Sequence, residues 1–448
     1  MHTPDANGDT RRCFWLRVRE FAVPPSMIES ATARRHAGDW AGACAAARVD
    51  VDLDLRAVAR AGGTELAARI RADLRHLAPD LLRWHMPRIA PDGLLRPGLT
   101  VSLARYAGPV HLVARTPPAW ADAGQRISLA VWDGSRRGAP HPHPHPHPDQ
   151  RFRLDLHRHL WDARRTGELR ARAGAPPGIA RPRDGTPPLS RGHAGGAVAL
   201  PGLGCAVDRW AAEATILLRA DGHPGTAVTV RVGARRRLVV DTADGSVTAA
   251  RGRGHGPVLP DAATWVPPDV ELLHAGLLDA GRLHPLVAAA LVPDRPPPTV
   301  PQDDPGAPRT VECRGQRHRI GLAGGVLVAF DHDPAEIRRE ELLAALGGTP
   351  LPCLQAIDEA HRRPECLTDV RARLDHGDAA GALAVVEGLL GPDALLRHGA
   401  LRDELETAAL RRVEHGLFRA GLAGNGPGPA QRDSRRGARS RPRHASLR

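Results

Sequence analysis

The chain of 448 residues contains no lysine, so all 62 of its basic side chains are arginines. A Walker-type phosphate loop depends on a lysine ammonium group, and enzymes that work through an imine need a lysine amine. Phosphate-loop nucleotidases, imine-forming aldolases and pyridoxal-phosphate enzymes are therefore not expected. Arginine in place of lysine throughout, with abundant Ala, Gly and Pro, indicates the codon bias of a GC-rich genome. A single arginine is consequently weak evidence for a site.

Aromatic residues, long apolar runs and cysteines are also scarce. Eight Trp, five Phe and one Tyr leave the cores to Leu, Val, Ile and Ala. No apolar run approaches the ~20 residues that span a bilayer, and the N-terminus lacks the apolar stretch of a signal peptide. The cysteines are too thinly spread for a disulfide scaffold: Cys13, Cys44, Cys205, Cys313, Cys353 and Cys366. We expect a cytoplasmic protein with reduced thiols and no membrane partner.

The positive charge is concentrated in two places. The net charge is +12. Residues 432–448 hold seven arginines and one acidic residue, and residues 151–193 hold ten arginines and four acidic residues. The rest of the chain is close to neutral. Non-specific attraction of nucleic acid by these two segments is therefore one interpretation, although no stacking aromatic residue follows Phe418.

Composition and periodicity predict an α+β protein of several parts, with helical hairpins at both ends, small antiparallel sheets between them, Pro-rich linkers and a disordered C-terminal tail. The predicted parts are a helical region with a small β piece (1–133), a His-Pro linker (134–150), an α+β region (151–291) with an internal linker (173–200), a Pro-rich linker (292–308), a β-hairpin with a helical region (309–421), and the tail (422–448).

Two short stretches share one pattern. Residues 34–47 (RRHAGDWAGACAAA) match residues 373–386 (RLDHGDAAGALAVV) at Gly-Asp, at the Gly three residues later and at the following Ala. In each, a glycine would end one helix in the left-handed conformation and the aspartate would cap the next. The pattern resembles one unit of a tetratricopeptide-type repeat, but the 34-residue period is missing.

Alternating apolar and polar residues predict strands within 99–133, 227–249 and 310–331, with turns at Gly315 and at Gly324–Gly325. Helices are expected over 154–172, 206–220, 270–291 and 335–346. The segment 157–174, which overlaps the first of these, is predicted to be an amphipathic helix, with Leu160, Trp161 and Leu169 partly buried.

The stretch 138–150 (GAPHPHPHPHPDQ) alternates histidine with proline. Proline pushes each preceding residue towards polyproline II geometry, which has three residues per turn and rises ~3.1 Å per residue. His141, His143 and His145 then point in three directions, and His141 and His147, which share a face, lie roughly 19 Å apart. A stiff spacer between two halves of the protein is favoured over adventitious metal binding and over a pH-sensing or partner-recognition element.

One set of residues could hold a metal: Cys313, His318, Cys353, His361 and Cys366. Their spacings are C-x4-H and C-x7-H-x4-C, whereas structural zinc sites usually bring ligands in tight pairs on turns. Buried apolar cysteines are the favoured interpretation of Cys353 and Cys366, and a zinc site is the alternative.

Two acidic clusters have structural interpretations as well. Asp50, Asp52 and Asp54 resemble the start of a calcium loop, but Leu55 and Ala61 stand where glycine and an acidic ligand would be needed. Asp331 and Asp333 follow an apolar strand, as in haloacid-dehalogenase phosphotransferases. Asp333, Pro334 and Glu336 instead match a helix start, and that family's lysine is missing.

The stretches 21–55 and 73–88 resemble a family of hypothetical actinobacterial proteins. The resemblance implies no activity, ligand or catalytic residue, and it favours a cytoplasmic setting in a high-GC bacterium. No catalytic residue and no cofactor is predicted. The favoured function is a non-catalytic adaptor or accessory protein that binds other proteins through its helical surfaces. The alternatives are a nucleic-acid-associated protein using 151–193 and the arginine tail, and a hydrolase around Asp331 and Asp333.

Overall fold

The computed structural model describes residues 6–134, 147–174, 204–233, 236–250, 256–293 and 309–422. The chain forms two compact units, Met1–Pro297 with Gly424–Arg448, and Pro298–Ala423. We call residues 1–297 the N-terminal unit and residues 298–423 the C-terminal unit. Most of the predicted linkers and the tail, namely 135–146, 175–200, 294–308 and 423–448, lie outside the described residues.

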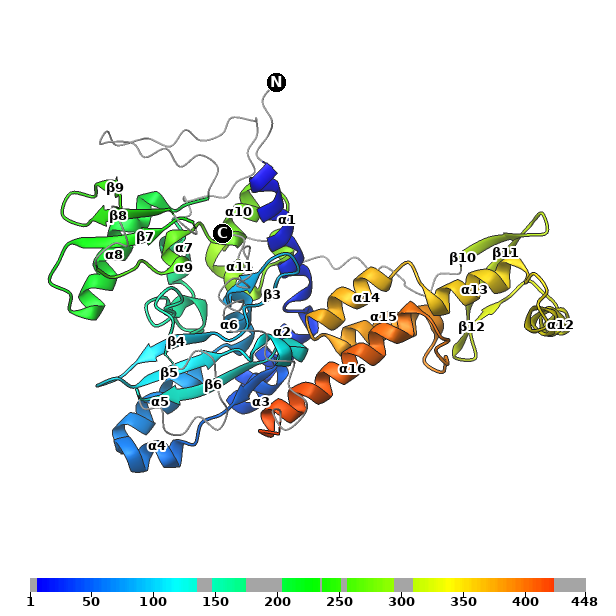
Figure 1. Cartoon of the computed structure of the whole chain (residues 1–448), viewed down its shortest axis with the longest axis horizontal. Coiled ribbons are helices and arrows are strands. Elements are labelled where there is room, and N and C mark those ends of the chain that lie inside the picture. The colour runs from blue at the N-terminus through cyan, green and yellow to red at the C-terminus, as the bar shows by residue number, and fades with distance from the viewer. Residues whose placement is uncertain are drawn as a thin grey trace, which may run out of the picture. The chain divides into compact units, whose positions relative to one another are not determined.

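Helices and small sheets make up both units, which confirms the predicted α+β class (Figure 1). The α-helices are α1 (Ala6–Phe21), α2 (Pro25–His36), α3 (Trp40–Ala46), α4 (Leu55–Gly62), α5 (Thr64–His76), α6 (Pro79–His85), α7 (Glu168–Arg172), α8 (Val207–Asp221), α9 (Asp261–Thr264), α10 (Pro268–His274), α11 (Pro285–Leu291), α12 (Pro334–Ala345), α13 (Pro352–Arg362), α14 (Leu367–Asp375), α15 (Ala379–Leu390) and α16 (Ala400–Arg419). The 3-10 helices are η1 (Ala119–Ala121), η2 (Ala123–Gln125), η3 (Arg158–Leu160) and η4 (Ala280–Arg282).

The strands are β1 (Val49–Val51), β2 (Arg88–Ile89), β3 (Leu94–Leu95), β4 (Thr100–Arg105), β5 (His111–Arg115), β6 (Ile127–Trp132), β7 (Ala227–Arg231), β8 (Arg237–Asp241), β9 (Val247–Ala249), β10 (Arg309–Cys313), β11 (Gln316–Ala323) and β12 (Val326–Ala329). None of the described helices is long and apolar enough to cross a membrane.

The larger sheet of the N-terminal unit has the order β1-β6-β5-β4. Strands β4, β5 and β6 lie within the predicted strand region 99–133 and pair antiparallel, and β1 pairs in parallel with β6. The helix-rich start of the chain therefore supplies an edge strand to this sheet.

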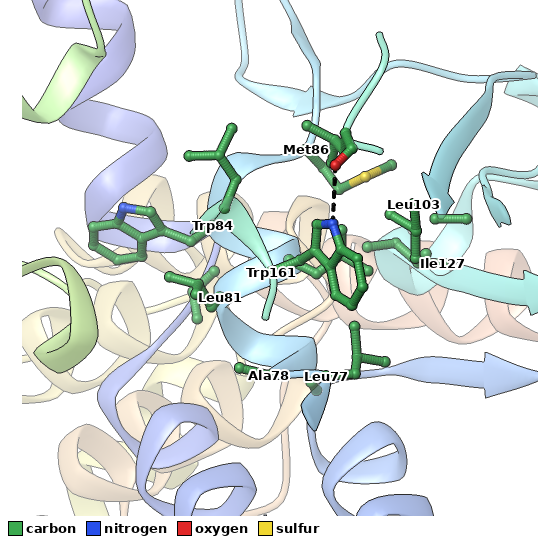
Figure 2. Close-up of a cluster of buried hydrophobic side chains, with 14 of the residues drawn as sticks. Leu77, Ala78, Leu81, Trp84, Met86, Leu103, Ile127 and Trp161 are labelled. Atoms are coloured by element: carbon green, nitrogen blue, oxygen red, sulfur yellow. Dashed lines mark hydrogen bonds between the residues drawn. The ribbon is translucent and has the colours of Figure 1, made fainter. Parts of the chain in front are cut away.

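One apolar core runs through the N-terminal unit, from Phe14 on α1 to Leu291 on α11. Trp161 is fully buried in it, where its indole N–H donates to the Leu154 carbonyl at 3.1 Å and its ring lies among the side chains labelled in Figure 2. A second cluster packs α8 against the antiparallel sheet β7-β8-β9.

The segments before and after the His-Pro stretch belong to the same core. The Asp149 N–H donates to the Thr100 carbonyl at 2.9 Å, and the Asp155 N–H donates to the Ser102 carbonyl at 2.8 Å. These bonds and the shared core join residues 147–174, which carry buried groups such as Trp161, to residues 6–133. Residues 135–146 of the His-Pro stretch lie outside the described residues, so its interpretation as a spacer stays a prediction.

Two expected helices are wrong in detail. The region 154–172 contains the short η3 and α7 instead of one amphipathic helix, and Leu160, Trp161 and Leu169 are buried rather than partly buried. The region 270–291 is split into α10, η4 and α11, with Pro285 at the first turn of α11. The helices predicted over 206–220 and 335–346 are confirmed as α8 and α12.

The C-terminal unit contains the sheet β10-β11-β12 followed by α12 to α16. Its two hairpin turns place Arg314 and Gly315, and then Gly324 and Gly325, at positive φ. This conformation suits the right-handed twist of the strands, so the predicted turns are confirmed. The cores of this unit are small, and the cluster beside the sheet contains five buried residues.

The two matching stretches form matching helical hairpins, α2–α3 and α14–α15. Asp39 and Asp378 each accept a hydrogen bond from the glycine N–H three residues later, at 2.8 and 3.2 Å. A Cβ on Gly42 or Gly381 would lie 2.0 Å from the capping carboxylate. The repeated glycine therefore leaves room for the cap, which explains the pattern seen in the sequence.

Candidate anion-binding cavity

A cavity of about 160 Å³ lies within the N-terminal unit. Its wall comes from α1, from the end of α6 with the residues after it, from residues 151–154, and from the residues leading into α10. These segments are far apart in the sequence and meet because each contributes to the core. Seven of the described arginines line the cavity, with one aspartate: Arg11, Arg19, Arg88, Arg151, Arg153, Arg172, Arg209 and Asp261.

Five of these arginines are paired with carboxylates. The ion pairs are Arg11 with Glu271 at 3.1 Å, Arg19 with Asp269 at 2.6 Å, Arg151 with Asp261 at 2.7 Å, Arg153 with Asp155 at 2.7 Å and Asp221 at 2.8 Å, and Arg172 with Glu213 at 2.6 Å. These five guanidinium groups hold segments of the unit together, and their charge is neutralised locally.

The pair of Arg19 and Asp269 is the most deeply buried of the five. Both side chains are 2% exposed, and Arg19 donates twice to the carboxylate, at 2.6 and 3.0 Å. The Trp84 indole N–H donates to the same carboxylate at 3.1 Å, and the Arg19 guanidinium lies 4.4 Å from the Trp84 ring centre. His85 lies beside this group, and burial lowers its pKa to about 4, so the imidazole is neutral near pH 7.

Arg88 differs from the paired arginines. It is 3% exposed, and its guanidinium donates to two backbone carbonyls, those of Arg83 at 2.7 Å and Gly93 at 3.4 Å. Its Nε has no hydrogen-bond partner, and no carboxylate of the described residues forms an ion pair with it. Burial, and then the charge of Arg19, lower the pKa of Arg88 to about 9, which leaves it charged at neutral pH. A buried cation without a counter-ion is costly to the fold.

Three further N–H donors of the cavity residues are buried without an acceptor among the described residues. They belong to Arg209 Nε, Trp15 Nε1 and Trp265 Nε1. Guanidinium and indole nitrogens donate and never accept, so a partner must bring acceptor atoms. Together with Arg88, these side chains give the residues that line the cavity more N–H donors than acceptors among the described residues.

The rest of the wall is apolar. Phe152, Leu154, Leu160 and Met86 line it, with the Trp84 ring. The Arg151 guanidinium lies 4.9 Å from the Phe152 ring centre. A ligand that fits must therefore combine acceptor oxygens with an apolar body. Hydrogen bonds from a guanidinium to a carboxylate or phosphate are charge-assisted and therefore strong, and Arg88 is the most deeply buried of the lining arginines without a carboxylate partner among the described residues.

The structure brings together two of the five residues predicted as metal ligands. Cys313 and Cys353 lie side by side in the C-terminal unit, and His332, which the sequence did not indicate, joins them. His318 lies next to them, with its ring stacked on that of His332 at 4.0 Å between centres. His361 and Cys366 do not join this group.

The acidic candidates have structural contacts. Asp50 forms an ion pair with Arg126, and Asp54 caps α4 by accepting from the Arg56 N–H at 2.8 Å. Asp333 caps α12, as expected, by accepting from the Ala335 N–H at 2.9 Å. Asp331 accepts from the Arg319 guanidinium at 2.9 Å and from its backbone N–H at 2.7 Å. Strand β12 pairs antiparallel to β11, unlike the parallel sheet of haloacid-dehalogenases.

The basic segment 151–193 is largely neutralised over its described part. Besides Arg151, Arg153 and Arg172, Arg158 pairs with Asp73, and Arg165 pairs with Glu168 at 2.6 Å. All of these arginines except Arg165 connect the segment to distant parts of the chain. Residues 175–193 and the arginine tail lie outside the described residues.

Sequence reasoning missed the cavity because arginine is the basic residue everywhere in this chain. Nothing in "RWHMPR", residues 83–88, separates Arg88 from the other 61 basic positions. The sequence does not indicate the metal candidate His332, because its neighbour Asp333 is explained by the helix start of α12. The feature of the sequence that points to this metal candidate is the pair of Cys313, directly before a hairpin turn, and Cys353, at a helix start.

Comparison of the chain with family models, curated proteins and solved structures finds no match.

Proposed function

We propose that the N-terminal unit binds a small organic anion, a carboxylate or phosphate attached to a planar apolar group. The observation that carries this proposal is Arg88, a guanidinium buried to 3% exposure in the cavity wall without a carboxylate partner among the described residues. A bound anion would supply the counter-charge that Arg88 lacks and accept hydrogen bonds from its guanidinium.

The size and lining of the cavity support a ligand of limited bulk. Its volume of about 160 Å³ is close to that of an engineered ~150 Å³ cavity that binds benzene. Trp15, Trp84, Trp265 and Phe152 can face a flat ring. A single-ring aromatic acid or its phosphate analogue matches both requirements, whereas a dinucleotide is too large.

The test is a titration of the full chain with benzoate and with phenyl phosphate, in which binding is measured by calorimetry and by tryptophan fluorescence. Benzyl alcohol is the neutral comparison. We expect saturable binding of at least one of the two anions, and binding of benzyl alcohol weaker by at least about tenfold, because one charged hydrogen-bonding group is worth roughly 1.5–3 kcal/mol.

The matched variants are Arg88→Met, in the cavity wall, and Arg71→Met, at an exposed position of α5. Arg88→Met is expected to weaken anion binding by about tenfold or more, and Arg71→Met to leave it unchanged. Saturable binding that is equal in the Arg88→Met variant and the unmodified protein would contradict the proposal. So would a lack of binding by either anion.

The functions expected from the sequence stay predictions. An adaptor role is favoured by α16, whose Leu410, Val413 and Leu417 are exposed at three- and four-residue spacing on one face. Nucleic-acid binding through 151–193 and the arginine tail stays an alternative, and residues 175–193 and the tail lie outside the described part of the chain. A hydrolase around Asp331 and Asp333 would need carboxylates that already contact Arg319 and the α12 backbone.

A further inference from the structure

The C-terminal unit contains a cluster of three groups that are typical zinc ligands. One ligand atom from each of Cys313, His332 and Cys353 lies within 4.8 Å of the other two. Around a tetrahedral zinc, bond lengths of ~2.3 Å to sulfur and ~2.0 Å to nitrogen place the ligand atoms roughly 3.5–3.8 Å apart. The observed spacing thus requires only small side-chain adjustments to accept the ion.

Each ligand is positioned by a different local structure. Cys313 is the last residue of β10, directly before the two-residue turn at Arg314 and Gly315. Cys353 is the second residue of α13, at the start of the helix. His332 lies between β12 and the capping residue of α12. Turns and helix starts are the places where structural zinc sites hold their ligands.

His332 has the surroundings of a metal-binding imidazole. Its side chain is 5% exposed, and its Nε2 is buried without a hydrogen-bond partner among the described residues. Its Nδ1 lies 3.7 Å from one carboxylate oxygen of Glu336. The other oxygen of Glu336 lies 2.8 Å from the Arg314 guanidinium. A carboxylate facing the second ring nitrogen is the usual support for a histidine that binds zinc through the first.

The packing around the cluster is weak without an additional cross-link. The apolar cluster here contains five buried residues, and two of them are Cys313 and Cys353. None of the twelve residues of α12, all of them described, is buried. A metal bound to His332 would connect the start of α12 to β10 and α13. Small domains with little apolar core commonly depend on such a metal.

We propose that Cys313, His332 and Cys353 bind one zinc ion, with water in the fourth position, and that this ion stabilises the C-terminal unit. The ring of His318 stacks flat against that of His332 at 4.0 Å, with its Nδ1 at 3.2 Å from the Asp331 carbonyl, so it supports the ligand without being one. This site is separate from the cavity of the N-terminal unit, and neither proposal depends on the other.

The test begins with the metal content of the full chain expressed in zinc-supplemented medium and dialysed. About one zinc per chain is expected. Cys313→Ser, Cys353→Ser and His332→Asn should each lose the metal. Cys366→Ser and His318→Asn are the matched controls, and they should keep it. Loss of zinc from His318→Asn would contradict the three-ligand assignment, and equal zinc in all variants would contradict the site.

A second measurement does not depend on whether the variants fold. The unmodified chain is stripped with a chelator under reducing conditions and titrated with cobalt(II). Two thiolate ligands predict a sulfur-to-cobalt charge-transfer band that saturates at about one ion per chain and disappears when zinc is added. A lack of this band, or a Cys313–Cys353 disulfide in the freshly purified chain, would overturn the proposal.

Discussion

Replacing Asp269 with asparagine is expected to destabilise the N-terminal unit strongly. The substitution keeps the shape of the side chain but removes the negative charge that faces Arg19. Both partners are 2% exposed, so water cannot replace the lost carboxylate. In the unmodified chain, two N–H groups of Arg19 and the Trp84 indole N–H donate to the two oxygens of Asp269. Asparagine offers only one acceptor oxygen for these three donors.

The magnitude follows from this burial. Removing one partner of a buried ion pair leaves an uncompensated charge and costs about 3–5 kcal/mol. Since domains are stable by about 5–15 kcal/mol, the variant would lose about a fifth or more of its stability. Replacing both partners, Arg19→Met with Asp269→Leu, removes the charge as well as its counter-ion. This double variant is expected to be close to neutral or stabilising.

Urea denaturation followed by tryptophan fluorescence measures this loss directly. All eight tryptophans lie between Trp15 and Trp265, so the signal reports the N-terminal unit even in the full chain. A loss below about 1 kcal/mol in the Asp269→Asn variant, which is the value of an exposed ion pair, would refute the reasoning. So would a double variant that is less stable than Asp269→Asn.

Two further predictions concern pH and the repeated hairpins. Burial lowers the pKa of His85 to about 4, so below pH ~6.5 the unfolded chain takes up a proton that the folded chain does not. The free energy of unfolding should therefore fall by about 3 kcal/mol as the pH is lowered from ~6.5 to ~4. His85→Gln should reduce this pH dependence, as measured by urea midpoints. Gly381→Ala should lower the free energy of unfolding by about 1 kcal/mol, because the added Cβ meets the Asp378 carboxylate that caps α15. Gly416→Ala, where the added Cβ lies in open space on α16, should raise it by up to about 1 kcal/mol. Helical circular dichroism during urea denaturation distinguishes the two, and equal effects would contradict this account of the repeated glycine.

The local structure of this chain could be predicted well wherever one short pattern determines it. Gly38 and Gly377 take positive φ and are followed by capping aspartates, and the turns at Gly315 and Gly324–Gly325 are confirmed. The region 154–172 could not be predicted, because its apolar residues are buried from several sides and their helical spacing is therefore misleading.

Tertiary features had almost no local signal. The parallel pairing of β1 with β6 joins segments about 80 residues apart, and the cavity is assembled from α1, α6 and residues near 151 and 265. Whether an arginine is neutralised depends on which carboxylate the fold brings to it. Arg19 has Asp269, which is 250 residues away, whereas Arg88 has no such partner among the described residues.

The most direct test of the anion-binding cavity is the urea midpoint of tryptophan fluorescence with and without phenyl phosphate. A ligand that binds the folded state stabilises it by about 2.7 kcal/mol at a concentration of 100 times its Kd. The cavity predicts that this midpoint rises with phenyl phosphate in the unmodified chain and in Arg71→Met. In Arg88→Met, where binding is weakened by about tenfold or more, the same concentration should stabilise the folded state by at most about 1.4 kcal/mol, so the midpoint should rise clearly less. A midpoint that is unaffected in the unmodified chain, or that rises equally in Arg88→Met, would contradict it.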